Sequence, residues 1–197
     1  MPKVAVVLLT DGFEEIEAVT PIDVLRRAGV EVFVAAVEGD RIHTAGRFAE
    51  FGKWIRAGAR EVLVVPDGAL GDATLTPDLV VLPGGLRGAQ NLAASEAARK
   101  YVLAVHAAGN ICAAICATPA LAFAPWGLLD NRRATCYPGM QDRFPPSARY
   151  VEDAVVVDGN VVTSRGPGTA FAFALTLAGL LAGPEAEANL RRDMIVE

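Results

Sequence analysis

The sequence predicts a single α/β domain in which a mostly parallel sheet carries helices on both faces. Short, continuously apolar segments alternate along the chain with stretches of helical periodicity. The apolar segments lack the polar alternation of half-exposed strands, which is typical of strands buried on both faces of a parallel sheet. A third observation is a change of hydrophobic period at Cys116, where a buried strand passes directly into a helix. Together these features predict a three-layer sandwich.

The individual elements follow in chain order, and the first three form a βαβ unit whose helix ends at Gly29. The expected strands are 4–9, 30–36, 62–65, 79–82, 111–115, 155–157 and 161–163, the last two forming a hairpin. The expected helices are 14–28, 93–108, 117–125, 168–181 and a short polar helix after them. Because sites of such sheets lie at the carboxyl ends of the strands, four loops are candidates: those after Leu9, Leu82, Ile115 and Thr163.

Length and composition narrow the class of protein. The 197 residues, 52% hydrophobic and 21% charged, suit one core, so we expect a single domain over 1–197. No apolar run is long enough to cross a membrane, and the start lacks the layout of a signal peptide. The net charge of −5 with mixed signs argues against nucleic-acid binding, and three cysteines suit a reducing compartment. We therefore expect a cytoplasmic protein with no nucleic-acid or membrane partner.

Cys116 stands where the strand 111–115 turns into the following helix, which has Pro119 in its first turn. Free amides and the dipole at a helix start favour an anion, so this corner predicts a thiolate at neutral pH. A lone cysteine in an apolar run is more often a small buried hydrophobic residue. The corner position favours a nucleophile instead.

The first candidate loop carries one glycine and four carboxylates, which argues against a dinucleotide site. Glu14 and Glu15 fit a surface role as complements of the helix dipole. Glu17 differs because the ring of Pro21 would clash with its carbonyl, so the helix must start late or kink there. Such a kink directs the Glu17 carboxylate toward Cys116, and we expect the pKa of Glu17 to be raised by a neighbouring thiolate.

The second candidate loop brings Gly84 and Gly85 to the same edge. Unhindered amides there suit an oxyanion hole, with the donors on Gly85 and Ala117. A hydrolytic cysteine also needs a histidine base, but His43 and His106 are the only histidines. Neither is well placed, so both are expected to be structural or surface residues.

Five ordered blocks resemble the ThiJ/PfpI superfamily, and more narrowly the Parkinsonism-associated deglycase family and its bacterial relatives. The blocks are Asp11-Gly12-Phe13-Glu14-Glu15-Ile16-Glu17, Leu82-Pro83-Gly84-Gly85, Ala113-Ala114-Ile115-Cys116-Ala117, Ala134-Thr135-Cys136-Tyr137-Pro138 and Thr163-Ser164-Arg165-Gly166-Pro167-Gly168-Thr169. The resemblance implies a flavodoxin-like, class I glutamine amidotransferase-like sandwich and a homodimer. It further implies an oxidation-prone Cys116 on a nucleophile elbow, with Glu17 as its hydrogen-bonding partner and Gly85 and Ala117 as amide donors.

Two features depart from the family pattern. Tyr137 stands where the superfamily's peptidases and glutamine amidotransferases place a histidine, which argues against peptidase or amidase activity. Tyr137 is instead expected to donate a hydrogen bond to substrate, with Gly84 also in the binding site. The segment 42–60 is longer than expected and carries Phe48, Phe51, Trp54 and Ile55 on one helical face, which predicts a contribution to a subunit interface.

The residues support two functions. In the first, Cys116 attacks reactive α-oxoaldehydes such as methylglyoxal, or their early protein adducts, and Glu17 shuttles the proton without metal or organic cofactor. This describes an enzyme of glyoxalase or deglycase type, a hydro-lyase or hydrolase. In the second, a redox-responsive stress protein, Cys116 is oxidised to sulfenic or sulfinic acid and alters a partner contact. Sequence alone leaves both open.

Overall fold

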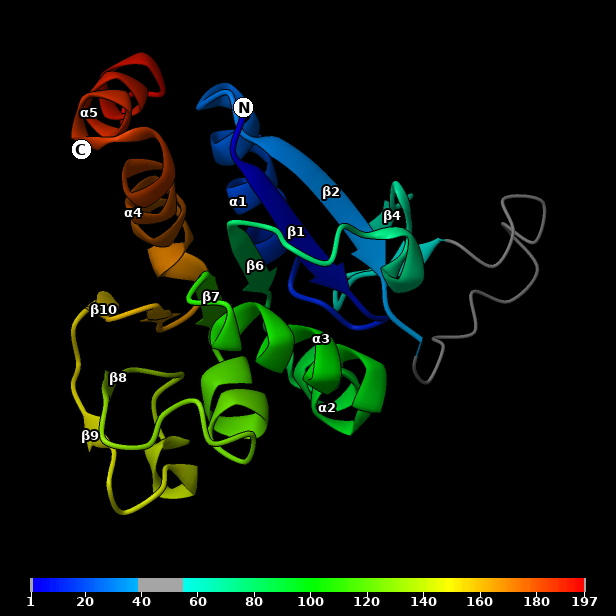
Figure 1. Ribbon diagram of the computed structural model, residues 1–197, viewed down its shortest axis with the longest axis vertical. Coiled ribbons are helices and arrows are strands. Elements are labelled where there is room, and N and C mark those ends of the chain that lie inside the picture. Colours follow the sequence, from blue (N-terminus) through cyan, green and yellow to red (C-terminus); the bar gives the residue numbers. More distant parts are fainter. Residues whose placement is uncertain (1, 39–54, 197) are drawn as a thin grey trace.

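The computed structural model describes residues 2–38 and 55–196, and its centre is a seven-stranded sheet (Figure 1). The strand order is β10-β11-β7-β6-β1-β2-β5. All neighbours are parallel except the β10–β11 hairpin at one edge. The bounds are β1 Val4–Leu9, β2 Glu31–Ala36, β5 Gly68–Ala69, β6 Leu79–Leu82, β7 Ile111–Ile115, β10 Val155–Asp158 and β11 Val161–Ser164.

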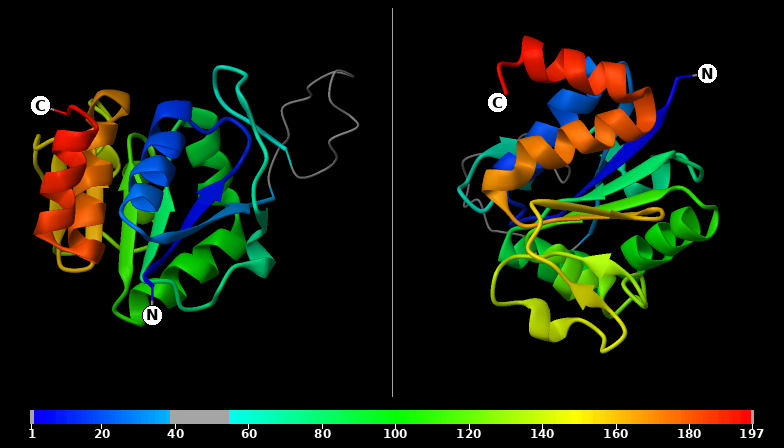
Figure 2. Two further views of the ribbon diagram at one scale, coloured as in Figure 1. Left: turned by 90° about the horizontal axis from the view of Figure 1, so that it is seen from above. Right: turned by 90° about the vertical axis from the view of Figure 1, so that its left-hand side faces the viewer.

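Helices cover both faces of the sheet, as the right-hand view of Figure 2 shows. One layer contains α1 (Glu15–Arg27), α4 (Ala170–Ala182) and α5 (Pro184–Asp193). The opposite layer contains α2 (Leu86–Ala94) and α3 (Glu96–Ala107). This arrangement confirms the predicted three-layer, flavodoxin-like α/β fold.

The strands β1, β2, β6, β7 and β11 contribute to two separate cores, one on each face of the sheet. In β1, Val7 and Leu9 pack with α1 and α4, whereas Val6 and Leu8 pack with α2 and α3. These four side chains are fully buried. Burial on both faces explains why the strand is continuously apolar. The sheet edge at the carboxyl ends is thereby held on a rigid support.

The end of α1 shows how one residue positions the next strand. Gly29 follows the helix with φ of +76°, a left-handed conformation that glycine adopts without steric cost. Its amide donates to the carbonyl of Arg26, and the Val30 amide donates to Leu25. These bonds satisfy the last carbonyls of the helix and turn the chain into β2, as the sequence predicts.

Several elements differ from the prediction. The expected helix 93–108 corresponds to α3, which begins at Glu96 because the Ser95 side chain caps it through the Ala98 amide at 3.2 Å, and the preceding helix α2 was not predicted. The expected strand 62–65 lies outside the main sheet, where β4 (Leu63–Val64) pairs with β3 (Arg56–Ala57). The helix expected at 117–125 is a π-helical turn, Pro119–Phe123. The pair β8 (Arg133–Ala134) and β9 (Arg149–Tyr150) was not predicted.

The remaining elements are short 3₁₀ turns at Leu70–Asp72, Gln141–Arg143 and Pro167–Thr169. Within residues 2–38 and 55–196, no helix combines the length and apolarity needed to cross a membrane.

Candidate active site

The four loops expected at the carboxyl edge of the sheet lie against one another. The Glu14 amide donates to the Gly84 carbonyl at 3.0 Å, which joins the loops after β1 and β6. The Cys116 amide donates to the Ser164 carbonyl at 3.0 Å, which joins the loops after β7 and β11. The loops therefore form one site, in the place that the parallel topology predicts.

Cys116 has an unusual backbone conformation. Its φ of +66° lies in the left-handed region, which costs a residue with a side chain on the order of 1–2 kcal/mol. The conformation is held from both sides, because the Cys116 amide binds Ser164 and its carbonyl accepts from the Tyr137 amide at 2.7 Å. Cys116 is 8% exposed. The predicted sharp corner between strand and helix is therefore present and strained.

The backbone amides of Gly85 and Ala117 act on the Cys116 thiol and lower its pKa. They are the two donors expected from the sequence, and they belong to different loops. Gly85 has φ of +81°, and a Cβ placed on it would overlap the carbonyl oxygen of Gly12. Only glycine therefore fits at this close contact between the loops after β1 and β6.

A buried hydroxyl group fixes the spacing between the loops after β6 and β7. Thr118 is fully buried, and its Oγ1 donates to the Pro83 carbonyl at 2.6 Å. Pro83 and Thr118 lie next to the residues that supply the amide donors, so this bond sets the separation of the two amides. Sequence reasoning missed Thr118.

Glu17 is completely buried and its carboxyl group faces Cys116. Its Oε2 accepts from the Gly84 amide at 2.9 Å. Among the described residues, its Oε1 has no well-aligned hydrogen-bond partner. The expected inward direction of Glu17 is therefore present, although α1 starts at Glu15 and continues through Pro21 rather than starting late.

Gly84 acts as a spacer between the two reactive side chains. A Cβ placed on Gly84 would lie 2.5 Å from both the Cys116 Cβ and the Glu17 Oε2, closer than real Cβ contacts allow. Its amide is already bound to Glu17. Contact of Gly84 with a substrate, as the sequence suggests, remains a prediction, while its positioning of Glu17 is visible.

The protonation of the pair differs from the sequence-based expectation. Burial raises the pKa of Glu17 to about 7. Burial, and then the charge of Glu17, raise the pKa of Cys116 to about 12, against the smaller opposing effect of the Gly85 and Ala117 amides. The expectation that the helix start alone makes Cys116 a thiolate is therefore wrong. The raised pKa of Glu17 is confirmed, but its main cause is burial rather than a neighbouring thiolate.

Tyr137 lies at the rim of the site and is 47% exposed. It lines an open pocket of about 330 Å³ together with Pro138, Arg165 and the turn at 166–169. A Cβ placed on Gly166 would lie 3.5 Å from the Tyr137 ring and 4.0 Å from Glu17 Oε1. The pocket wall at Gly166 therefore lies near the carboxyl group of Glu17 and against the Tyr137 ring.

His106 lies at the opposite edge of the sheet. Its Nε2 is 3.3 Å from Nη2 of Arg132, and its carbonyl accepts from Asn160 at 3.1 Å. Burial and the charge of Arg132 lower its pKa, so the ring is a neutral acceptor. The expected structural role of His106 is confirmed, and His43 lies outside the described residues.

The other two cysteines lie in packed positions. Cys112 is buried within β7 and Cys136 is buried beside Tyr137, where its Sγ is 3.4 Å from the Tyr137 carbonyl. Burial raises the pKa of each to about 12. All three cysteines are free thiols. Residues 2–38 and 55–196 contain no cluster of three metal-ligating His, Cys, Asp or Glu side chains.

The described end of the long segment 42–60 packs on the loop after β1. The Gly12 amide donates to the Ala57 carbonyl, and the Ala59 amide donates to the Phe13 carbonyl, both at 2.7 Å. Glu15 accepts from the Arg60 amide at 2.6 Å, so it anchors this segment instead of being a free surface charge. Of the residues expected to form an interface, Phe48, Phe51 and Trp54 lie outside the described residues and Ile55 is partly buried, so the interface role stays a prediction.

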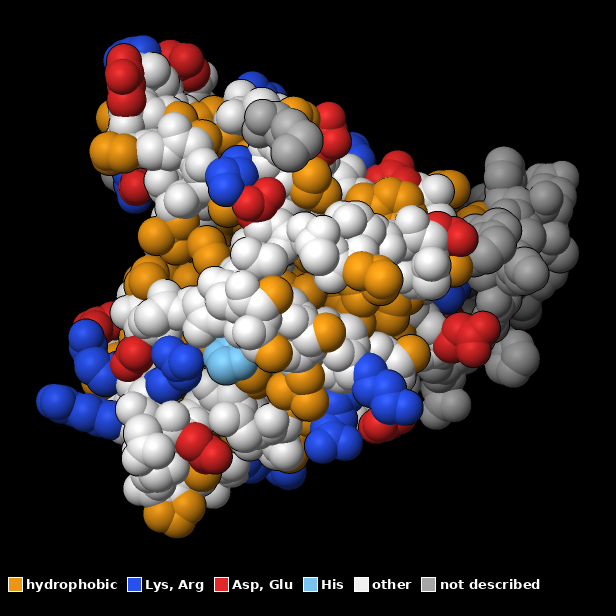
Figure 3. Space-filling model, viewed as in Figure 1, with side chains coloured by type: hydrophobic (Ala, Val, Ile, Leu, Met, Phe, Trp, Pro, Cys, Tyr) orange, Lys and Arg blue, Asp and Glu red, His pale blue; other side chains and the backbone are white. Residues whose placement is uncertain are grey.

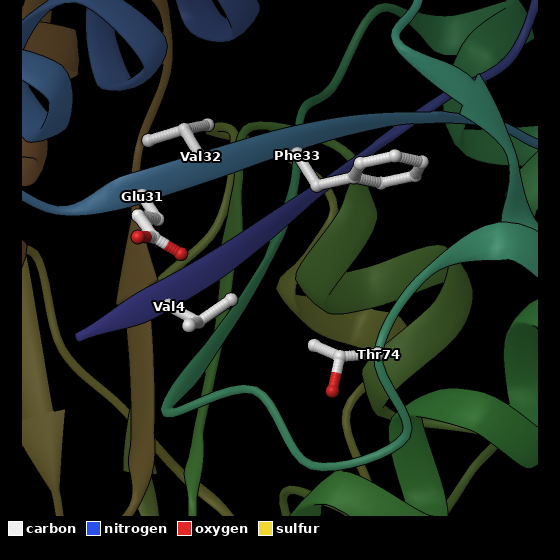
Figure 4. A pocket seen from close by; sticks show the side chains of 5 residues that line it. All are labelled: Val4, Glu31, Val32, Phe33 and Thr74. Carbon is white, nitrogen blue, oxygen red and sulfur yellow. The ribbon is translucent and has the colours of Figure 1, made fainter. Parts of the chain in front are cut away.

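A second pocket, of about 350 Å³, lies at the opposite edge of the sheet (Figure 4). It is lined by Val4, Glu31, Val32, Phe33 and Thr74, which come from the starts of β1 and β2 and from the loop before β6. Glu31 is its single ionisable residue, and it is exposed.

Comparison with known proteins finds relatives that are similar along nearly the whole of this chain. The chain is 39% identical over 195 residues to Protein DJ-1 homolog B of Arabidopsis thaliana, covering 98% of this chain but only 42% of that relative. It is 34% identical to the glutathione-independent glyoxalase DJR-1.2 of Caenorhabditis elegans, covering 98% and 96% of the two chains. The fold is similar to the crystal structure of Drosophila melanogaster DJ-1beta, with a TM-score of 0.86, 37% identity and full coverage of both chains.

The five sequence blocks thus lie at one edge of a fold shared with these relatives. Residues 2–179 match the DJ-1/PfpI family, and this range includes the sheet and the edge that carries Glu17 and Cys116. The chain belongs to the DJ-1/PfpI family.

Proposed function

We propose that this protein is an enzyme that acts on reactive α-oxoaldehydes, with Cys116 as the nucleophile and Glu17 as the proton shuttle. The observation that carries the proposal is a buried carboxyl group with a pKa of about 7 facing a cysteine in a strained, left-handed backbone conformation, with two backbone amides that lower the pKa of its thiol. A base or acid with a pKa near the working pH is the most effective proton shuttle. The similarity to a protein named as a glutathione-independent glyoxalase supports the same reaction class.

In the first step, the Cys116 sulfur attacks the aldehyde carbon of methylglyoxal. Ionised Glu17 takes the thiol proton as the carbon–sulfur bond forms, and the proton then passes to the carbonyl oxygen. The product is a hemithioacetal. This order explains why a thiol with a raised pKa still reacts: the thiolate forms only as Glu17 accepts its proton.

In the second step, Glu17 removes the proton from the carbon bonded to sulfur and returns a proton to the neighbouring carbon through an enediol. The hemithioacetal thereby becomes a thioester, with one carbon oxidised and its neighbour reduced. Water then cleaves the thioester to lactate and free Cys116. The sum is methylglyoxal plus water giving lactate, and it needs neither metal nor organic cofactor.

The amides of Gly85 and Ala117 suit the negative charge that develops in these steps, because each already points at the sulfur. Tyr137 stands at the rim, and we assign its hydroxyl to a hydrogen bond with a substrate oxygen. Early adducts of oxoaldehydes on protein side chains present the same carbon at the same edge. A glycated protein is therefore a second substrate class for one chemistry.

The proposal is tested by incubating the purified protein with methylglyoxal in the absence of glutathione and following lactate by NMR. We expect catalytic formation of lactate by the natural chain and none by Cys116→Ala. Stoichiometric loss of methylglyoxal without lactate would contradict the proposed enzyme.

A redox role for the same cysteine is the second candidate. Its support is the pair of amides at the sulfur and the unpaired Oε1 of Glu17, which together suit the oxygens of a sulfenic or sulfinic acid. Peroxide treatment followed by mass spectrometry tests it. Oxidation confined to Cys116, without methylglyoxal turnover, would favour this role over the enzyme.

We also infer a homodimer that works in the cytoplasm. Ile16 and Val19 on α1 are 50% and 47% exposed, one helical turn apart, and such apolar pairs suit a subunit interface. Figure 3 shows hydrophobic side chains in the hollow between α4 and β10. The exposed large hydrophobic residues of those elements are Val157, Phe171 and Leu180. Light scattering over a concentration series tests the dimer, and Ile16→Ser with Val19→Ser is expected to shift the mass toward the monomer.

A further inference from the structure

The turn at 164–169, at the end of β11, lies against the reactive pair although none of its side chains takes part in the proposed reaction. The Ser164 carbonyl, at its start, accepts from the Cys116 amide at 3.0 Å. In the middle of the turn, a Cβ placed on Gly166 would lie 4.0 Å from Glu17 Oε1. The position of this turn therefore affects both Cys116 and Glu17.

One hydroxyl group, that of Thr169, holds the turn together. Its Oγ1 accepts from the amides of Arg165 at 3.3 Å and Gly166 at 3.1 Å. Its hydrogen faces two acceptors, Ser164 Oγ at 2.7 Å and the Gly166 carbonyl at 2.9 Å. Because the Ser164 hydroxyl itself donates to the Ala154 carbonyl at 2.7 Å, Thr169 is the donor between the two hydroxyl groups. A single side-chain oxygen thus connects three consecutive residues of the turn.

The backbone of Cys116 depends on this turn because its φ of +66° is left-handed. A residue with a side chain keeps such a conformation only where its surroundings hold it. The Ser164 carbonyl holds Cys116 on its amide side, and the Ser164 hydroxyl is bonded in turn to Thr169 and Ala154. Loss of the Thr169 hydroxyl removes the acceptor of two backbone amides and loosens the turn that keeps Cys116 beside Glu17.

We propose that Thr169 is a positioning residue for Cys116, which acts through the Ser164 carbonyl and does not touch the substrate. The inference rests on the proposed function, in which Cys116 must face Glu17 to lose its proton. It also gives a role to the fifth sequence block, 163–169, to which the proposed reaction assigns none.

The test uses Thr169→Val, which keeps the shape of the side chain and removes its hydroxyl. Alkylation of Cys116 by iodoacetamide is followed over a series of pH values by mass spectrometry of the labelled peptide. Near neutral pH we expect the rate to fall about fivefold, the size that the loss of one hydrogen bond predicts. The rise of the rate near the Glu17 pKa of about 7 should also weaken, so that the pH profile approaches that of a free thiol.

Two variants separate positioning from a general loss of stability. Thr169→Ser retains the hydroxyl and should recover the natural pH profile. Thr176→Val removes a hydroxyl that donates to Ala172 inside α4 at 2.8 Å, and should leave the rate and the profile of Cys116 unchanged. An unchanged or faster rate in Thr169→Val, or an equal fall in Thr176→Val, would overturn the inference.

A further variant keeps the inference testable if Thr169→Val does not fold. Ser164→Ala retains the carbonyl that binds the Cys116 amide but removes the hydroxyl that connects it to Thr169. The same change in the pH profile is expected, and a natural profile in Ser164→Ala would overturn the inference. Failure of the proposed reaction would appear separately, as an absence of lactate from methylglyoxal while the alkylation of Cys116 still depends on Thr169.

Discussion

The two edges of the central sheet carry pockets of similar size and very different chemistry. The pocket at the carboxyl edge measures about 330 Å³, and the one at the amino edge measures about 350 Å³. Each is lined by one charged residue, Arg165 or Glu31. Beside the first pocket lie a fully buried carboxyl group and a cysteine with a left-handed backbone. The second contains an exposed carboxylate on an ordinary strand.

This difference indicates which properties distinguish the candidate site from the second pocket. Volume and the presence of charge do not separate the two edges. Burial of ionisable groups does, because it raises the pKa of Glu17 to about 7 and couples it to Cys116. The carboxylate of Glu31, in contrast, is exposed to water. Each of the following experiments tests whether reactivity belongs to one edge alone.

Removing the nucleophile should have the largest effect. Cys116→Ala is expected to abolish methylglyoxal turnover, because no other described thiol faces Glu17. Stability should change little, since alanine adopts the same left-handed backbone at a similar cost. Lactate formation and thermal unfolding measure the two properties. Cys112→Ala, at a buried site within β7, serves as a control that should lose stability but retain turnover.

Replacing the carboxyl group of Glu17 should have the second-largest effect. Glu17→Gln preserves the shape of the side chain and removes its proton transfer, so we expect a loss of about 100-fold or more in kcat. Glu31→Gln makes the same change at the amino edge and should leave kcat unaltered. A comparable loss in both variants would show that the two edges do not differ in the proposed way.

The pH dependence of alkylation should show the coupling of Glu17 and Cys116. Deprotonation of the pair begins near the Glu17 pKa of about 7, so the alkylation rate of Cys116 should rise through that pH. In Glu17→Gln this rise should be missing. A natural chain that reacts only above about pH 8.5, like a free thiol, would contradict the coupling.

The free energy of unfolding should also depend on the protonation of Glu17, and the raised pKa of this group determines the direction of the change. The folded pKa of Glu17 is raised above its ordinary value of 4.5, so its protonated form favours the fold. That contribution is fully present below pH 4.5 and is lost as pH rises through about 7. The free energy of unfolding of the natural chain, relative to Glu17→Gln, should therefore decline over this window. Urea denaturation at several pH values measures it.

Loosening the spacing of the two amide donors should have a smaller effect. Thr118→Val keeps the shape but leaves the buried Pro83 carbonyl without its donor, at a cost of about 1–3 kcal/mol. We expect a fall of about tenfold in the alkylation rate of Cys116, and Thr118→Ser should restore most of it. Thr176→Val, which removes a hydroxyl bond inside α4, is the matched control. Loss of stability without any change in Cys116 reactivity would reduce Thr118 to a structural residue.

The smallest effect is expected at the rim. Tyr137→Phe removes one hydroxyl from a half-exposed side chain and should raise KM a few-fold with little change in kcat. Steady-state kinetics with methylglyoxal measure both constants. A fall in kcat as large as that of Glu17→Gln would place Tyr137 in proton transfer instead of substrate binding.

The position of the site could be predicted from the sequence because it depends on topology. Continuous apolar strands and intervening helices define a parallel sheet, and the loops after Leu9, Leu82, Ile115 and Thr163 then share one edge. The inward direction of Glu17 was predicted from a clash with Pro21, but α1 continues through Pro21, so the direction was right and the reason given for it was wrong. These inferences use neighbours in sequence or general rules of chain connection.

The predictions that were wrong or missing mostly concern contacts between residues that are distant in sequence. The bond from Thr118 to Pro83 spans 35 positions, and no local pattern announces it. The protonation of Cys116 depends on the depth of burial that Glu17 and four loops create together, whereas the helix-start argument considered only adjacent amides. The helix α2 was missed because it begins directly after Gly84 and Gly85 and contains Gly88, and glycine disfavours a helix.

The close packing around Gly84 limits how this site can change through evolution or design. A side chain at this position would occupy the space of the Cys116 Cβ and the Glu17 carboxylate at once. A side chain at Gly84 would therefore displace both Cys116 and Glu17, and we expect this position to accept only glycine as long as those two side chains keep their places. Tyr137 and Arg165 lie in an open pocket without that restriction. New substrate preferences should accumulate at these rim residues, while the chemistry beneath them stays constant.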